Sequence, residues 1–280
     1  MARHHIQAGI LREWDMDTPH VFGDIPDVDR PVIAYRADYP DAHTIPTHHH
    51  DRHQLLHGVS GVVMVTTVDG AWVMPPQQGM WIPAGVRHSV RMFGAVHTNS
   101  LYFRTDATPG MPDHCQVVGI SPFMRALLAE AVQLPREYAL GGRDDGLMAL
   151  LPHEVARLPH LPLSLPLPRH EPLARLCRQL LQTPNVHETI DAWSGRLGMN
   201  RRTFTRLFKR ETGLSFMTWR QQACLVMALP RLARGEAVTA VAMEFGYDNP
   251  AAFTAMFQRA LGAPPKTYLR KRASMPTSLP

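Results

Sequence analysis

The chain has 280 residues, of which 45% are hydrophobic, and a formal net charge of +5. This length and apolar content suffice for two folded domains and exclude a chain that is disordered throughout. Residues 1–14 lack the apolar core of a signal peptide, and nowhere do about eighteen apolar residues run together, so we expect neither secretion nor membrane insertion.

Charge and histidine are spread unevenly along the chain. Residues 1–168 contain 12 Lys and Arg against 17 Asp and Glu, a net charge of −5, whereas residues 169–280 contain 17 against 7, a net charge of +10. Fourteen of the 16 histidines precede residue 169. A basic half suits a polyanion such as DNA, although a solvated basic face is the alternative. The three cysteines share no metal or disulfide spacing, which favours a reducing cytoplasm.

Residues 30–105 alternate in the manner of β-strands, in short runs such as 62–68, 71–74 and 100–103. Asp69-Gly70 between two of these runs predicts a hairpin. Regular short strands with Gly and Pro turns favour a sandwich or a small barrel.

Two helices are predicted after the strands. Ser121 is placed to cap the first, over 121–134, with Pro122 in its first turn. The second spans about 144–158, and Pro152 should bend or divide it. The pair either dimerises or covers the open end of the barrel. Residues 158–172 contain five prolines, which places the domain boundary near 168, with alternating leucines that allow a last strand.

Two helix-turn-helix patterns follow. In the first, over about 190–210, Gly198 provides the turn and Asn200 caps a helix with Phe204, Leu207 and Phe208 inward. The second, over about 238–260, has Gly246 at its turn and Asn249-Pro250 opening its recognition helix. We expect the first to read bases through arginine and the second mainly to position the protein. The candidate DNA-contacting residues are Asn200, Arg201, Arg202, Thr205, Arg206, Lys209, Asn249, Ala251, Thr254, Ala255, Gln258, Arg259 and Lys266.

Residues 215–235 predict a connecting helix of about twenty residues, hence roughly 30 Å long, which approaches one turn of B-DNA. Pro230 would kink it.

The stretch from about 172 to 272 resembles the DNA-binding domain of the AraC/XylS family of bacterial transcription regulators. The resemblance rests on Phe204-x3-Phe208-Lys209, Glu211-Thr-Gly-Leu214, Ala242-x2-Phe245-Gly246-Tyr247, Phe253-x3-Phe257 and Pro264-Pro-x2-Tyr268. It implies an all-helical domain that acts on promoters, and a companion N-terminal domain, often a cupin barrel, that binds an effector or dimerises.

The histidines of the first half resemble the two cupin motifs. His48-x-His50 places two imidazoles on one face of a strand, and Pro83-x-Gly85-x2-His88 supplies a third. Gln54 stands where cupins usually have Glu, and Met92 where Asn is frequent. We expect a divalent transition metal at His48, His50 and His88, with Gln54 as a further donor. The alternative is a degenerate cupin whose histidines hydrogen-bond internally or bind an organic effector.

Aromatic residues of the same strands, Trp72, Trp81 and Tyr102, are the candidates for lining an effector pocket. His53, His57 and His97 are expected to be surface or packing residues.

Together these patterns predict a two-domain α+β protein. Residues 1–168 form a cupin-like β-barrel, β-rich to about 118, with helices over about 121–158, and residues 169–280 form the all-α DNA-binding domain. We expect a cytoplasmic transcription regulator without enzyme activity, whose partners are double-stranded operator DNA, a small-molecule or metal effector, a second copy of the chain and, for an activator, RNA polymerase. The alternative is a metal-dependent cupin oxygenase or isomerase with an accessory DNA-binding tail.

Overall fold

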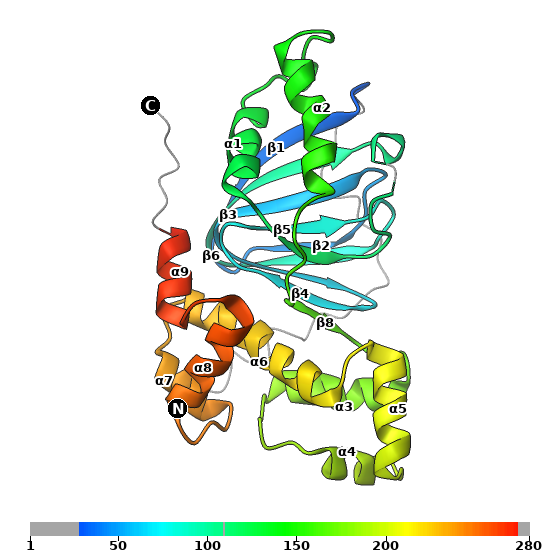
Figure 1. The fold of residues 1–280 in the computed structure, drawn as a ribbon, viewed down its shortest axis with the longest axis vertical. Coiled ribbons are helices and arrows are strands. Elements are labelled where there is room, and N and C mark those ends of the chain that lie inside the picture. The colour runs from blue at the N-terminus through cyan, green and yellow to red at the C-terminus, as the bar shows by residue number, and fades with distance from the viewer. Residues whose placement is uncertain (1–27, 109, 274–280) are drawn as a thin grey trace. The chain divides into compact units, whose positions relative to one another are not determined.

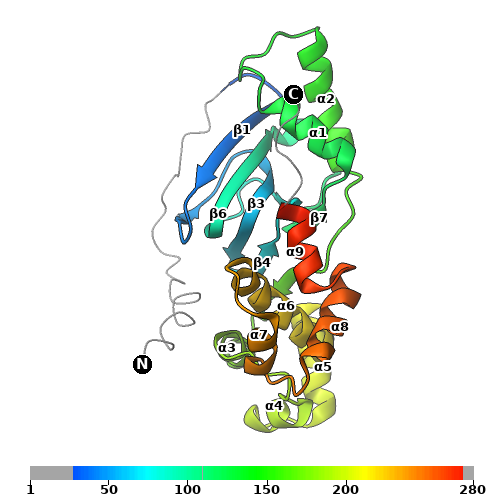
Figure 2. The same cartoon turned by 90° about the vertical axis from the view of Figure 1, so that its left-hand side faces the viewer.

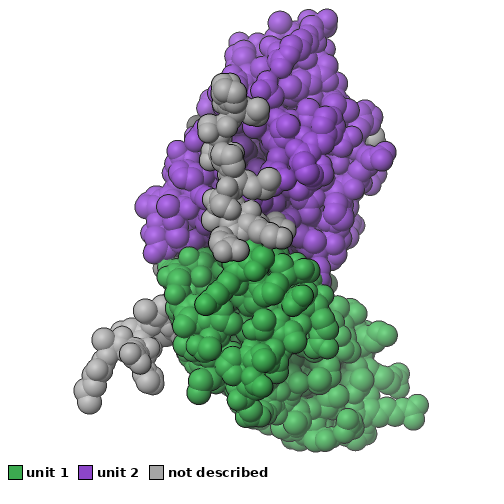
Figure 3. Space-filling view, turned by 60° about the vertical axis from the view of Figure 1, so that its left-hand side comes forward, with its two compact units in different colours: residues 1–18, 68–71, 164–270 green, residues 19–67, 72–163, 271–280 purple. Residues whose placement is uncertain are grey.

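The computed structural model describes residues 28–108 and 110–273 (Figure 1). The chain divides into two compact units (Figure 3). We call the described parts of residues 19–67 and 72–163 the β unit, and residues 68–71 with 164–270 the helical unit. The division therefore falls before Ser164, slightly earlier than the expected boundary near 168. The segment 1–14, for which we expect no signal peptide, lies outside the described residues.

The β unit is built on strands β1 to β7 of an antiparallel sheet, as predicted, whereas β8 belongs to the helical unit together with the first two residues of β4. The strands run in the order β1-β6-β3-β4-β8, with β2 paired to β6, β5 to β3 and β7 to β5. Long β3 and β6 change register around residues 58–62, where bulges bend them, and Figure 2 shows β1, β6 and β3 side by side. The strands are β1 (Val32–Tyr39), β2 (Thr44–His48), β3 (His53–Thr67), β4 (Gly70–Met74), β5 (Gln78–Ile82), β6 (His88–Phe103), β7 (Gln116–Gly119) and β8 (Ser164–Pro166).

The predicted hairpin at Asp69-Gly70 is confirmed, because β3 ends at Thr67 and β4 begins at Gly70. Its turn, residues 68–71, belongs to the helical unit. There the Asp69 carbonyl accepts a hydrogen bond from the Leu167 amide at 2.9 Å, next to β8. The last strand expected from the alternating leucines is therefore present.

Helices α1 (Pro122–Ala131) and α2 (Arg143–Val155) pack on one face of this sheet (Figure 1). The Ser121 hydroxyl caps α1 by accepting from the Met124 amide at 3.0 Å, as predicted. The core between helices and sheet consists mainly of Leu55, Trp81, Leu101, Phe103, Met124, Leu128, Met148 and Leu151. The helices therefore cover a sheet face. Pro152 does not divide α2, which runs on to Val155.

Seven α-helices make up the rest of the described chain. They are α3 (Glu171–Gln182), α4 (Ile190–Arg196), α5 (Arg201–Thr212), α6 (Phe216–Ala233), α7 (Val238–Glu244), α8 (Pro250–Leu261) and α9 (Pro265–Ala273). Gly213 and Gly262 end α5 and α8 in the left-handed conformation that glycine adopts without strain. Pro230 lies inside α6 without ending it. Within the described residues, no helix combines the length and apolarity needed to span a bilayer.

Candidate functional site

The first helix-turn-helix is formed by α4 and α5. Gly198 lies between them with a φ of +62°, a conformation that strains a residue with a side chain. Trp193 of α4 is buried and packs against Phe208 of α5, with ring centroids 6.3 Å apart, and against Phe216, 4.8 Å away. Asn200 caps α5 by accepting from the Thr203 amide at 2.9 Å. The turn and this aromatic cluster fix the direction in which α5 points.

The outward face of α5 is cationic, because Phe204, Leu207 and Phe208 take the inward positions. Arg202, Arg206 and Lys209 are exposed. Arg201 differs from them, since its guanidinium pairs with the Asp191 carboxylate at 3.1 Å. The Thr205 hydroxyl donates to the Arg201 carbonyl at 2.8 Å. Asn200 and Thr205 thus have a structural role in the free protein, and Arg202, Arg206 and Lys209 present the charge.

The second helix-turn-helix consists of α7 and α8. Gly246 between them has a φ of +84°, and an added Cβ would approach the Asn185 side-chain oxygen to 3.0 Å. Asn249 accepts from the Ala251 amide at 2.8 Å and opens α8, as the sequence predicts. Phe253, Met256 and Phe257 are buried. The remaining candidates are exposed at Asn249, Ala251, Ala255, Gln258, Arg259 and Lys266, and half-buried at Thr254.

Helix α6 connects the two motifs over 18 residues, hence about 27 Å (Figure 1). Near its end, Arg231 pairs with Glu236 at 2.6 Å and with Glu244 of α7 at 2.5 Å. Before α4, the Glu188 carboxylate accepts from the Trp193 indole at 2.8 Å. Sequence reasoning missed these residues, because their partners are set by how the helices pack. Arg231 ties the second motif to the connector, and Glu188 fixes Trp193 within the first motif.

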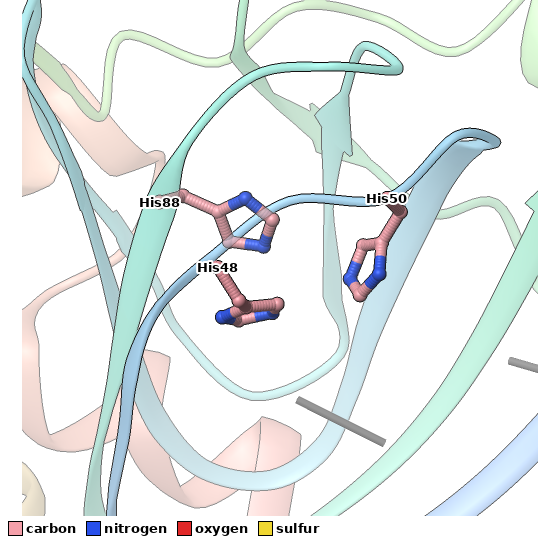
Figure 4. A group of neighbouring side chains, drawn as sticks. All are labelled: His48, His50 and His88. Carbon is pink, nitrogen blue, oxygen red and sulfur yellow. The ribbon is translucent and has the colours of Figure 1, made fainter. Parts of the chain in front are cut away.

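In the β unit, the three histidines of the cupin-like motifs converge. His48 ends β2, His50 follows it in the loop, and His88 begins β6 (Figure 4). One ring nitrogen from each lies within 4.8 Å of the other two. The strand register brings His48 opposite His88, with ring centroids 4.3 Å apart. The fold therefore gathers the predicted ligand set in one place.

Backbone carbonyls fix the tautomer of two of these rings. The Nδ1 of His48 lies 2.8 Å from the Pro46 carbonyl, and the Nδ1 of His88 lies 2.8 Å from the Val86 carbonyl. A carbonyl oxygen only accepts, so each Nδ1 carries the proton and each Nε2 carries the lone pair. The Nε2 of His88 is buried and has no hydrogen-bond partner among the described residues. This is the arrangement in which a histidine binds a metal ion.

Burial keeps these histidines neutral. Desolvation, followed by the charge of the neighbouring His48, lowers the pKa of His88 to about 3 and that of His50 to about 4. The pKa of His48 is also lowered, mainly by burial. Neutral imidazoles are the form that coordinates a cation.

Gln54 lies on the same side of the sheet as this cluster. Its amide nitrogen donates to the Tyr102 hydroxyl at 3.0 Å and to the Ser100 hydroxyl at 3.3 Å, and the Tyr102 ring stands edge-on to His50 at 5.2 Å. The Gln54 Oε1 is buried without a partner in the described part of the chain. Tyr102, a candidate effector-pocket residue, therefore connects Gln54 to the histidines.

The two tryptophans take different positions. Trp81 faces α1 and α2, and its indole donates to the Pro112 carbonyl at 2.9 Å. Trp81 and Tyr102 lie on opposite faces of the sheet, because Trp81 is opposite Leu55 and Tyr102 is opposite the adjacent Gln54. The two therefore do not line one effector pocket together. Trp72 is buried on β4, and its indole nitrogen has no acceptor among the described residues.

His53, His57 and His97 are not members of the cluster. His53 stacks on Trp81 at 5.1 Å, His97 is exposed and contacts Asp38 at 2.6 Å, and His57 is buried. All three are surface or packing residues, as expected.

An antiparallel β domain with a cluster of three histidines, followed by two helix-turn-helix motifs, defines a transcription regulator with a ligand-binding domain. Residues 31–184 match the AraC-like ligand binding domain, and residues 193–271 match a helix-turn-helix domain family. The chain belongs to the AraC family of transcriptional regulators.

Two named relatives are HTH-type transcriptional regulators. The chain is similar to the HTH-type transcriptional regulator NimR of Escherichia coli K12, with 32% identity over 231 residues, covering 82% of this chain and 84% of NimR. It is 27% identical over 110 residues to the HTH-type transcriptional regulator RipA of Corynebacterium glutamicum, covering 39% of this chain and 33% of RipA. Among solved structures, ToxT of Vibrio cholerae O395 aligns over 88% of this chain and 99% of its own, at 11% identity and a TM-score of 0.36.

Proposed function

We propose that this regulator reads operator DNA mainly through Arg202 and Arg206 of α5, and that a divalent transition metal at His48, His50 and His88 forms part of its effector site. The convergence of three neutral imidazoles, with the buried Nε2 of His88 unpartnered among the described residues, is the observation that carries the metal assignment. Effector binding at this site then changes the affinity for operator DNA.

The donor atoms suit the late first-row metals. Imidazole nitrogen is a ligand of intermediate softness that Zn²⁺, Ni²⁺, Cu²⁺ and Fe²⁺ accept. When bound, such an ion supplies Lewis acidity to an incoming ligand. The carbonyls of Pro46 and Val86 would hold the rings in the required orientation, since a carbonyl that accepts from one ring nitrogen leaves the other to bind the ion.

The role of the ion in this proposal is binding and not turnover. No Asp or Glu of the described residues is buried, so none of them is enclosed with the three histidines as a general base. Enzyme activity is tested by incubating metal-loaded protein with candidate organic substrates. Product formation would contradict a role of the ion in binding alone.

We propose further that the regulator is a cytoplasmic homodimer that binds paired sites and, where it activates, contacts RNA polymerase. The outer face of α1 supports dimerisation because Phe123 is 54% exposed there. A second copy of the same face would remove this apolar surface from water.

Selection of bound sequences from random duplex DNA tests the function. Full-length protein is purified without a histidine tag. It is tested after a chelator has removed bound metal, and again after loading with Zn²⁺, Ni²⁺ or Co²⁺. We expect enrichment of a site with two boxes about one helical turn apart, and a metal-dependent change in affinity that His88→Ala abolishes. His97→Ala is the matched control, because His97 is exposed and away from the cluster. Equal affinity with and without metal contradicts the metal proposal, and no enriched site contradicts sequence-specific reading.

A further inference from the structure

Gln54 gives the candidate metal site an electrostatic character of its own. The described groups of the site are three imidazoles, the Tyr102 phenol beside His50, and the Gln54 carboxamide that donates to this phenol. Imidazole coordinates a cation as a neutral ligand, and neither the phenol nor the carboxamide contributes a charge. The Gln54 amide is held on its nitrogen side by Ser100 and Tyr102, which leaves its buried Oε1 as an acceptor or ligand atom. A divalent ion bound by neutral donors keeps both of its positive charges.

No described group beside the site offsets that charge. Asp51, the carboxylate next to His50 in sequence, is exposed to solvent. Arg52 is cationic and donates to the carbonyls of Val28 and Arg30. In a buried site, charge that water does not screen attracts a counter-ion strongly.

The buried indole N–H of Trp72 is a hydrogen-bond donor that suits an electron-rich ligand. The indole nitrogen of Trp72 can only donate, and it is buried without an acceptor in the described part of the chain. Trp72 shares a face of β4 with Met74, and Met74 lies beside Gly58, where an added Cβ would meet it at 3.0 Å. Gly58 is four residues from Gln54 along β3, so the two face the same side of the sheet. Trp72 therefore lies on the Gln54 side of the sheet.

We infer that the effector of this regulator is a small oxyanion, such as a carboxylate or an enolate, that coordinates the metal and supplies the negative charge the protein leaves out. This inference rests on the metal site of the proposed function. The carboxylate that cupins usually place at the Gln54 position is then contributed by the ligand.

Spectroscopy of Co²⁺-loaded protein tests the inference without any assay of activity. Full-length protein that has been freed of metal is titrated with Co²⁺ at pH 7.5. The visible absorption of the bound ion is then followed while acetate or acetamide, or oxalate or oxamide, is added. The paired probes have nearly the same shape and differ in charge. We expect the anion of each pair to change the Co²⁺ spectrum at a concentration at least about tenfold lower than its neutral partner.

The variant Gln54→Glu makes the complementary test, because it returns a carboxylate to the site. We expect it to bind Co²⁺ more tightly and to weaken acetate or oxalate binding at least about tenfold. Gln133→Glu makes the same change at an exposed position after α1 and should leave both affinities unaltered.

The outcomes separate the two proposals. Protein that binds no Co²⁺ overturns the metal site and this inference together. Protein that binds Co²⁺ but responds equally to anions and amides overturns only the inference. The wild-type titration decides the matter even where Gln54→Glu fails to fold.

Discussion

Arg202 and Arg206 differ from Arg201 in what surrounds their guanidinium groups. Arg201 is engaged by Asp191 across the first motif, whereas Arg202 and Arg206 project from the exposed face of α5. An exposed ion pair is worth at most about 1 kcal/mol, so Arg201 can still exchange Asp191 for a phosphate. Arg202 and Arg206 are therefore better placed than Arg201 to read bases.

Replacing either exposed arginine should weaken and broaden sequence reading. Arg202→Ala or Arg206→Ala removes a fork that can donate twice to guanine, and should cost about 1–3 kcal/mol on the preferred site with relaxed preference at one base pair. Binding is measured on a panel of single-base operator variants. Arg210→Ala, near the end of the same helix, is the control. A uniform loss on all sequences would show that the arginine contacts phosphate.

His57 is a buried histidine outside the metal cluster, and both of its ring nitrogens lack partners among the described residues. Burial lowers its pKa in the folded chain to about 3, and Arg125 contributes. The unfolded chain therefore takes up a proton first as the pH falls below about 6.5. The contribution of neutral His57 to the free energy of unfolding is fully present above that pH. It decreases by about 1.4 kcal/mol for each pH unit below it.

The variant His57→Leu should flatten this acid dependence. The free energy of unfolding is measured by urea denaturation between pH 4 and pH 7.5. Below about pH 6.5, its slope against pH should be smaller in the variant than in the wild type by about 1.4 kcal/mol per pH unit. At pH 7.5 we expect no loss of stability, because the leucine buries no unpartnered nitrogen. His153→Leu, at an exposed position, should leave the slope unchanged. An unaltered slope in His57→Leu would mean that the imidazole is protonated in the folded protein.

At the scale of elements, the turn of the first motif depends on backbone conformation rather than on space. A Cβ at Gly198 would meet nothing within 4 Å, and the same is true at Gly195 in α4. The two glycines differ in φ, which is positive only at Gly198.

This pair separates strain from packing. Gly198→Ala should destabilise the helical unit by about 1 kcal/mol, since alanine resists the left-handed conformation. Gly195→Ala should stabilise it by about 0.5–1 kcal/mol, because alanine is the better helix former. Thermal unfolding of both variants checks the sign. Equal effects would mean that the turn adopts another conformation in solution.

The exposed apolar face of α1 gives a second prediction for an element. Phe123→Glu should leave the fold intact, since the side chain is 54% exposed, and should shift the chain toward monomer in light scattering. Affinity for DNA that carries two copies of the operator site should fall, while affinity for DNA that carries one copy stays the same. Glu130→Gln, on the same helix, is the control. A dimer that survives Phe123→Glu would place the interface elsewhere.

For the whole molecule, the charge separation between the halves dictates how binding depends on salt. The net charge of +10 in residues 169–280 lies in the part that carries both motifs, and the acidic part precedes it. Affinity should therefore fall steeply with salt concentration. Lys209→Gln and Lys266→Gln should each reduce the slope of log K against log salt by about 1 and weaken all sequences alike. An unchanged slope would remove that lysine from the interface.

Local sequence patterns were enough to establish the class of this protein. Two helix-turn-helix patterns, the alternating strands and the spacing of His48, His50 and His88 are local periodicities, which follow from the geometry of a helix or a strand and need no knowledge of neighbours. The caps at Ser121, Asn200 and Asn249 were predictable for the same reason.

Packing between distant segments set the features that local patterns left open. It turned Trp81 toward α1 and α2 and away from Tyr102, engaged Arg201 with Asp191, and set the Gln54 amide against Ser100 and Tyr102. The fold also places Pro152 and Pro230 inside continuous helices. These features escape a reading of the sequence because side-chain direction follows from local geometry, whereas the partner it meets is chosen by how strands and helices pack.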